Sequence, residues 1–257
     1  MKVLITGAAG FTGRRLAAVM PGDVFAATRD HADLTDAVAV RALLASVHPA
    51  AIFHLAGGVC GTLEDDYVAN IITTENVLGA VRDLCLPCRV LLVGSAAEYG
   101  PAHGRIAETA PLRPVSAYGL IKVCQTFLMR AFDDLDLVMA RTFNLTGDGQ
   151  STRLLAGRVA AWVAAGKPGR LRLGALDAVR DYLPVEEAAA AYIRIARYGT
   201  RGEVYNVGSG QPVLIRDLVC TLAGDLDLVD EEPGAPGVGG AAGEVVADVS
   251  KLEALPC

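Results

Sequence analysis

A tyrosine and a lysine stand four residues apart, at Tyr118 and Lys122, in a segment whose apolar spacing predicts a helix over residues 117–132. That separation places both side chains on one face of a helix. A phenol beside an ammonium group is suited to exchanging a proton with a substrate oxygen. Ser95, at the end of an expected strand, adds a hydroxyl that can hydrogen-bond the same oxygen. These residues predict a proton-transfer site, although the spacing alone also occurs by chance on helix surfaces.

Tyrosine is a weak acid, so partial ionisation of Tyr118 near neutral pH requires its pKa to fall from ~10 by about 2–3. Lys122 and the positive ring of an oxidised nicotinamide are expected to supply that field. The chemistry indicated is hydride transfer between a nicotinamide and a carbon that bears oxygen, with the proton moving through Tyr118.

Three glycines, Gly7, Gly10 and Gly13, follow the first expected strand and open the first expected helix. Gly7 permits a tight turn, Gly10 lets the backbone approach a pyrophosphate, and Gly13 lets the helix lie close to the strand. The free N–H groups of the helix start attract phosphate. We expect a dinucleotide site that also includes Phe11 and Thr12; the alternative is a degenerate loop that binds nothing.

The second expected strand is followed by Arg29 and Asp30. Arg29 favours NADP(H) over NAD(H), because a guanidinium can pair with the 2′-phosphate; alternatively, Asp30 binds the ribose hydroxyls of NAD and Arg29 is solvated. Asp33 and Leu34 are expected at the adenine.

Small residues at 56–58 follow the third expected strand and would let the backbone lie under the cofactor. Leu55, Ala56 and Gly57 are expected to bind it. His54, just before them, is expected to be a buried core side chain rather than a catalytic group.

Short apolar runs alternate with helical patterns along the chain, which predicts the α/β class with a doubly wound parallel Rossmann sheet. The expected strands are residues 3–6, 24–28, 51–55, 90–94, 137–141 and 204–207, and the expected helices are residues 13–20, 36–47, 64–84, 117–132, 152–165, 185–198 and 215–222.

Two units are expected. Residues 1–147 form the NAD(P)-binding Rossmann domain, to which later elements return, and residues 148–257 form a small, interleaved, C-terminally short lobe that binds substrate. The Gly- and Pro-rich residues 230–243 are expected to be an exposed loop.

Composition excludes several classes of protein. The 257 residues carry a net charge of −6, so nothing indicates nucleic acid, and no apolar run reaches the ~18 residues of a membrane span. We expect a cytoplasmic protein.

The six cysteines are scattered along the sequence and are expected to be reduced. The Cys85–Cys88 pair could be a redox or zinc motif, but it fits an ordinary helix-to-strand link better. No metal is expected.

Five motifs, in order, are TGAAGFTG, FHLAG, GSAAEYG, SAYGLIK and RTFNLTGDGQ. With them the chain resembles, over nearly its whole length, the NAD(P)-dependent sugar-nucleotide epimerase/dehydratase family of the extended short-chain dehydrogenases/reductases. Within that family, LGALDAVRDYLPVEEAAAAY and GEVYNVGSG are most similar to GDP-4-keto-6-deoxymannose reductases.

The resemblance implies roles for named residues. The serine, tyrosine and lysine named above fall on the family's catalytic triad. Asn144 falls on an asparagine that contacts the substrate diphosphate, and Arg180 on an arginine at the nucleotide end. The backbone near Phe143 would meet the nicotinamide amide. A structural asparagine and an Arg180–Asp pair are the alternatives.

Two departures limit the resemblance. Dehydratases of the family carry an acid directly after the catalytic serine or threonine, where this chain has Ala96 and Ala97; Glu98 is expected to point elsewhere. Without that acid, dehydration is not expected. The second departure is that Pro233–Gly237 stand where the family has an arginine-bearing segment that binds the nucleotide.

The resemblance implies NADPH reduction of the 4-keto group of a nucleotide-linked 4-keto-6-deoxyhexose. The alternatives are a 4-epimerase of nucleotide sugars with tightly bound NAD and a non-catalytic binding protein. A homodimer through residues 64–84 and 117–132 is the family expectation.

Overall fold

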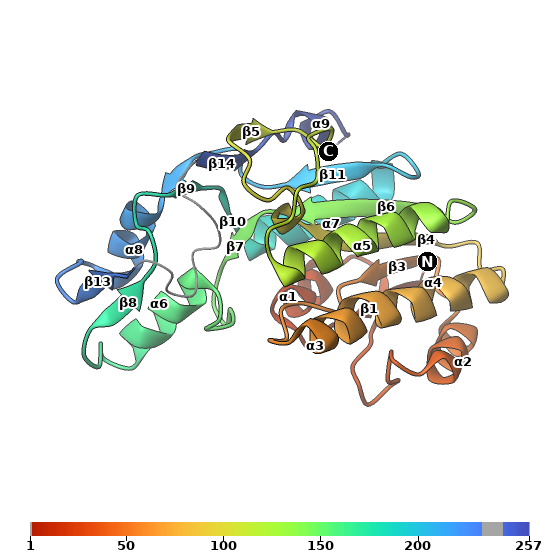
Figure 1. Cartoon of the computed structure of the whole chain (residues 1–257). Helices are drawn as coiled ribbons and strands as arrows, with labels where there is room; N and C mark the ends of the chain where they lie inside the picture. The colour runs from red at the N-terminus through yellow and green to blue at the C-terminus, as the bar shows by residue number, and fades with distance from the viewer. Residues whose placement is uncertain (1, 233–243, 257) are drawn as a thin grey trace.

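The computed structural model describes residues 2–232 and 244–256. Its main sheet has six parallel strands in the order β11-β6-β4-β3-β1-β2 (Figure 1). The strands are β1 Lys2–Thr6, β2 Asp23–Ala26, β3 Ala51–His54, β4 Arg89–Ser95, β6 Asp136–Thr142 and β11 Val204–Val207. All six expected strands are present, and the predicted doubly wound Rossmann sheet is confirmed.

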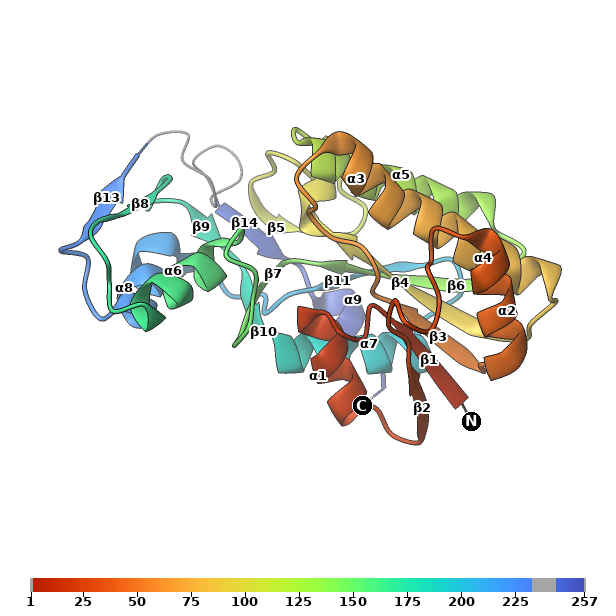
Figure 2. The same ribbon diagram turned by 90° about the horizontal axis from the view of Figure 1, so that it is seen from below.

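Helices cover both faces of the sheet (Figure 2). On one face lie α1 Phe11–Val19 and α7 Val185–Tyr198; on the other lie α2 Ala37–Val47, α4 Thr73–Asp83 and α5 Ala117–Ala131. Successive residues of β1 point to opposite faces, so Ile5 packs against Leu16 and Leu4 against Val40 within the two cores. Burial on both faces explains the continuous apolar runs.

The helix expected over residues 64–84 has three consecutive parts: α3 Leu63–Tyr67, a wider π turn over Val68–Ile72, and α4. The amide of Asn70 inside the π turn donates hydrogen bonds to the carbonyl oxygens of Asp66 and Gly58. The hydroxyl of Thr74 donates to the carbonyl oxygen of Asn70. Side chains that compete for backbone carbonyls are a known cause of such irregular turns.

A third hydrophobic cluster lies beyond the carboxyl ends of the strands, within elements seen at the left in Figure 2. It is built from α6 Leu155–Ala164, β8 Leu171–Leu173, α8 Ile215–Ala223 and β13 Val229–Glu231. The sequence between α6 and α8 contains α7, which returns to the main sheet. The boundary at residue 147 stays a prediction, and most of the loop expected at 230–243 lies outside the described residues.

Short strands join the two regions. They are β5 Gly104–Ile106, β7 Asn144–Thr146, β9 Val179–Arg180, β10 Tyr182–Pro184, β12 Val213–Leu214 and β14 Glu244–Ala247, followed by a short helix, α9 Ser250–Glu253. We did not predict these elements, because most are only two or three residues long and do not form a continuous apolar run.

A buried ion pair joins the end of β4 to β6. The carboxylate of Glu98 lies 2.9 Å from Arg141 Nη2, and these side chains are 0% and 2% exposed. The other oxygen of Glu98 accepts the N–H of Ser95 at 2.8 Å, and Oε2 also accepts the hydroxyl of Thr126 from α5 at 2.7 Å. One carboxylate thus binds three elements together.

We predict that Arg141→Met lowers the free energy of unfolding by about 3–5 kcal/mol, because the carboxylate of Glu98 is then left charged and unpaired in the core. Urea unfolding measures the effect. Arg170→Met is the control: Arg170 pairs with Asp230 at the surface, and its loss should cost no more than about 1 kcal/mol. Equal effects in both variants would contradict the assignment.

Candidate active site

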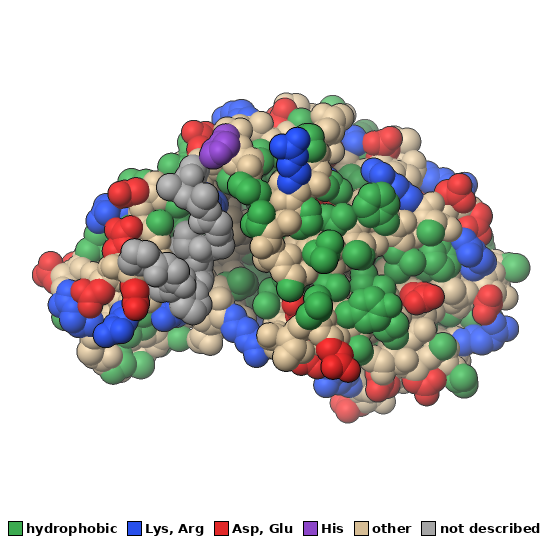
Figure 3. Space-filling model, viewed as in Figure 1, with side chains coloured by type: hydrophobic (Ala, Val, Ile, Leu, Met, Phe, Trp, Pro, Cys, Tyr) green, Lys and Arg blue, Asp and Glu red, His purple; other side chains and the backbone are tan. Residues whose placement is uncertain are grey.

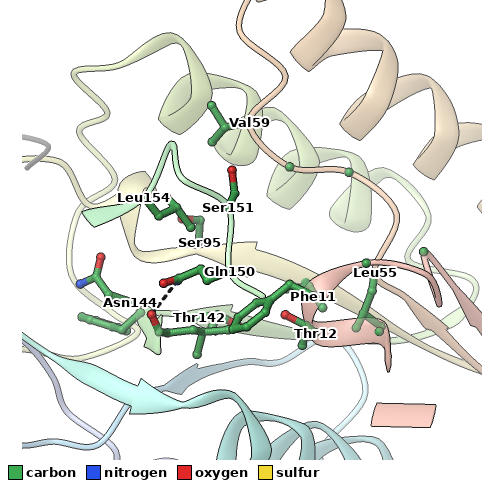
Figure 4. A pocket seen from close by; sticks show the side chains of 18 of the residues that line it. Phe11, Thr12, Leu55, Val59, Ser95, Thr142, Asn144, Gln150, Ser151 and Leu154 are labelled. Carbon is green, nitrogen blue, oxygen red and sulfur yellow. Dashed lines mark hydrogen bonds between the residues drawn. The ribbon is translucent and has the colours of Figure 1, made fainter. Parts of the chain in front are cut away.

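A cavity of about 460 Å³ opens at the carboxyl ends of the main strands and reaches the outer region at α6 (Figure 4). Phe11, Thr12 and Leu55 lie at one end, Ser95 and Thr142 in the middle, and Asn144, Ser151 and Leu154 toward α6. Loops after parallel strands meet at this edge of a sheet, which is where such folds bind ligands.

The glycine loop forms the wall of the cavity beside α1. Gly7 has φ +67°, which favours glycine, and a Cβ added at Gly13 would lie 2.2 Å from the carbonyl oxygen of Gly7. Gly10 is the N-cap of α1 and carries no capping side chain, so the first N–H groups of the helix remain available to an anion. The backbone therefore fits a dinucleotide pyrophosphate.

The residues after β3 line the next part of the cavity: Leu55 and the small residues Ala56, Gly57 and Gly58. His54 itself is buried, and its ring nitrogens lie 2.8 Å from Thr6 Oγ1 and 3.1 Å from Thr74 Oγ1. Burial, with Lys122 nearby, lowers the pKa of His54 to about 3. The expectation of a core histidine is confirmed.

Ser95, Tyr118 and Lys122 meet in the centre of the cavity. Ser95 lies near the phenol of Tyr118, and its hydroxyl by itself would lower the pKa of Tyr118 by favouring the phenolate. Lys122 Nζ lies 5.8 Å from the centre of the Tyr118 ring and donates to the carbonyl oxygen of Val93 at 2.9 Å. The arrangement can hold an oxygen atom between two hydroxyl groups beside a cation.

The pKa of Tyr118 is nevertheless raised, because desolvation by burial outweighs the effect of Ser95. In the protein alone, desolvation disfavours the phenolate more than the neighbouring groups stabilise it. The expected lowering also involves the positive ring of a bound nicotinamide, and it stays a prediction. Burial also lowers the pKa of Lys122 to about 8, against the attraction of Glu98 and Asp66. At neutral pH the site therefore holds a neutral phenol and, in most molecules, an ammonium.

No carboxylate reaches the cavity from the turn after Ser95. Ala96 and Ala97 fill the first two positions of that turn, and Glu98 points into the core toward Arg141. The expectation for Glu98 is confirmed.

Of the two residues expected to bind substrate, Asn144 lines the cavity and Arg180 does not. Asn144 lines the cavity, and its Nδ2 donates to the carbonyl oxygen of Asp181 at 3.0 Å, which fixes the amide. Phe143, beside it, also lines the cavity. Arg180 lies buried in β9 and donates to the carbonyl oxygen of Val179; it is not among the lining residues of the described chain. Its role stays a prediction.

The residues expected at the adenine lie outside this cavity, on the connection that follows β2. Arg29 is exposed, the carboxylate of Asp33 accepts the N–H and hydroxyl of Thr35, and Leu34 packs partly into the core under α2. Their contacts with a cofactor stay predictions.

Sequence reasoning missed a cation, Arg153, which lines the cavity from the segment before α6. Its Nη1 donates to the carbonyl oxygen of Val59 at 3.0 Å, across the cavity from its own segment. Within the described chain, the charged lining residues are Lys122 and Arg153, so the wall carries positive charge only. An arginine three residues after the RTFNLTGDGQ motif was the available signal.

The cysteine pair does not form a bond: Cys85 is exposed, Cys88 is buried, and both are free thiols. Across the described residues, no three His, Cys, Asp or Glu side chains are grouped to hold a metal ion.

No helix within residues 2–232 and 244–256 has both the length and the apolar character needed to cross a membrane.

Residues 3–208 match the model of the NAD dependent epimerase/dehydratase family. The chain belongs to this family, whose enzymes use a nicotinamide cofactor on nucleotide-linked sugars, and the resemblance seen in its motifs is confirmed.

Relatives agree with this assignment. The chain is 30% identical to a dTDP-6-deoxy-L-talose 4-dehydrogenase (NAD(P)(+)) of Kitasatospora kifunensis, over 91% of this chain and 80% of the relative. It is 29% identical to a GDP-6-deoxy-D-mannose reductase of Pseudomonas aeruginosa, over 90% and 82%. The solved structure of RMD from Pseudomonas aeruginosa complexed with NADPH superposes with a TM-score of 0.84, 25% identity and coverage of 98% and 91%.

We predict that Gly13→Ala abolishes nicotinamide-dinucleotide binding, because the new methyl group would overlap the backbone of Gly7. Calorimetry with NADPH and NADH measures the loss. Gly79→Ala is the control, since a Cβ at Gly79, on α4, meets no atom within 4 Å. Binding by Gly13→Ala at the affinity of the unchanged protein would show that this loop is not the site.

Proposed function

We propose that the protein uses NADPH to reduce the 4-keto group of a nucleotide-linked 4-keto-6-deoxyhexose. The observation that carries the proposal is that Ser95, Tyr118 and Lys122 line one cavity beside the glycine loop, and that no carboxylate enters this cavity from the turn after Ser95, because Glu98 points into the core. A ketoreductase needs a proton donor at the substrate oxygen, whereas a dehydratase needs an additional acid or base.

Each catalytic residue has a separate role. The Ser95 hydroxyl binds the keto oxygen and orients it toward Tyr118. Bound NADPH supplies the hydride. The Tyr118 phenol, kept neutral by its raised pKa, gives its proton to the oxygen as the carbonyl becomes a hydroxyl. The ammonium of Lys122 stabilises the resulting phenolate until solvent returns a proton.

The charge of the cavity supports an anionic substrate. Lys122 and Arg153 line it, and Asn144 offers an amide oxygen and N–H beside them. We assign the diphosphate to Asn144, the nucleotide end to Arg180, and the substrate-binding role to the lobe at 148–257. The names of the relatives point to deoxysugars linked to dTDP or GDP.

NADP(H) is proposed over NAD(H) because Arg29, exposed after β2, can pair with a 2′-phosphate. Asp30 beside it supports the second candidate, a 4-epimerase with tightly bound NAD. A cytoplasmic location follows from this use of nicotinamide and nucleotide sugars.

Incubation with NADPH and GDP-4-keto-6-deoxymannose tests the proposal, with the dTDP-linked ketosugar in parallel. We expect loss of NADPH absorbance and a fall of about 10²–10⁴-fold in rate for Tyr118→Phe, since the phenol is the proton donor. Tyr198→Phe, at the end of α7, is the control. No NADPH loss, with NAD co-purifying, would favour the epimerase; unchanged biological activity of Tyr118→Phe would favour a non-catalytic protein.

We also propose a homodimer. Apolar side chains gather on the face formed by α3 and α5 (Figure 3). The exposed members are Leu63, Tyr67, Val68, Leu120 and Phe127. An exposed apolar face of this kind is typical of a contact between proteins, and the two helices are those that the family uses.

Phe127→Glu should convert the dimer to a monomer, because a buried unpaired carboxylate in the interface is costly. Light scattering after size exclusion measures the mass. Val38→Glu, on the exposed side of α2, is the control and should leave the mass unchanged. A monomeric unchanged protein would contradict the proposal.

A further inference from the structure

Lys122 is held by two hydrogen bonds inside the protein. Its ammonium donates to the carbonyl oxygen of Val93 and to Oε1 of Gln125, each at 2.9 Å. An ammonium has three protons. One proton therefore remains for the cavity, where Tyr118 lies.

Behind Gln125 lies a chain of buried polar groups that leads away from the cavity. Its Nε2 donates to Thr74 Oγ1 at 2.9 Å, and Thr74 in turn gives its hydroxyl proton to the carbonyl oxygen of Asn70 at 2.6 Å. Gln125 and Thr74 are 1% and 0% exposed, so water does not replace these contacts.

The number of protons that each group carries fixes the direction of every hydrogen bond in this series of buried polar groups. Thr74 has spent its one proton on Asn70, so His54 Nε2, at 3.1 Å, must donate to the hydroxyl oxygen. His54 Nδ1 then carries no proton and accepts the hydroxyl of Thr6 at 2.8 Å. Because Thr74 has no second proton to donate, the part of the Gln125 amide that faces it must be the N–H donor. The amide oxygen therefore faces Lys122.

We infer that Gln125 is a positioning residue for Lys122, and that Thr74 and the neutral Nε2–H form of His54 hold its amide with the oxygen toward the ammonium. In the opposite orientation the amide would present N–H donors to a cation. These contacts favour the ammonium form of Lys122 over the neutral amine and direct its third proton into the cavity. A role of this arrangement in catalysis rests on the proposed function. The effect of Gln125 and Thr74 on the charge and orientation of Lys122 does not rest on it.

Other groups also act on this lysine and must be kept constant in a test. The carboxylates of Glu98, after β4, and Asp66, on α3, favour the ammonium, and Tyr118 and the neutral ring of His54 lie nearby. Variants of Gln125 leave all four in place. Thr74→Val also removes the acceptor of His54 Nε2–H, so it is compared with Thr74→Ser, which keeps the hydroxyl.

Lysine titration by NMR gives a direct test, because the chain has four lysines. With ε-labelled lysine, Lys122→Arg assigns the signal. We expect Gln125→Glu to raise the pKa of Lys122 by about 1–3, since an opposite charge is placed against the ammonium. Thr74→Val should lower it by up to about 1, and Thr74→Ser should restore it because the hydroxyl is retained. Gln211→Glu, at an exposed site, is the matched control.

A pKa of Lys122 unchanged in both Gln125→Glu and Thr74→Val would overturn the inference. If Thr74→Val does not fold, the near-isosteric Gln125→Glu still decides the question. NADPH consumption by the unchanged protein is measured separately, so absence of reductase activity would reject the proposed function without changing the result for Lys122.

Discussion

The carboxylate of Glu98 joins three parts of the chain that are distant in sequence. It accepts the N–H of Ser95 at the end of β4, the hydroxyl of Thr126 on α5, and the guanidinium of Arg141 on β6. Helix α5 carries Tyr118 and Lys122, and β6 leads directly to Phe143 and Asn144. Because a buried charge tolerates little displacement from its partners, this one carboxylate fixes the relative positions of the catalytic candidates.

The same burial explains why the site lacks an acid. Glu98 is the first carboxylate after Ser95, and its negative charge is already neutralised by Arg141 inside the core. The two alanines before it supply no proton donor or acceptor. Among the described residues, the cavity is therefore lined by two cations and by neutral polar groups, which suits proton donation to a carbonyl bound to an anionic carrier.

Much of this arrangement could be predicted from the sequence. The six strands and the helices around them follow from apolar runs long enough to show a period, and the Tyr118–Lys122 spacing placed both on one helix face. The short strands β9 and β14 are set by pairing between distant segments, which no local pattern reveals. Arg153 reaches the cavity only because the loop at Val59 folds toward it, and the direction of the pKa change at Tyr118 depends on burial that the sequence does not specify.

Transfer of deuterium from NADPH labelled at C4 of the nicotinamide tests the central claim most directly. With GDP- or dTDP-4-keto-6-deoxyhexose as substrate, we expect one deuterium at C4 of the sugar in a single configuration, and one NADPH consumed for each product molecule. Interconversion of C4 epimers without net NADPH consumption, or a product with no deuterium, would contradict a reductase.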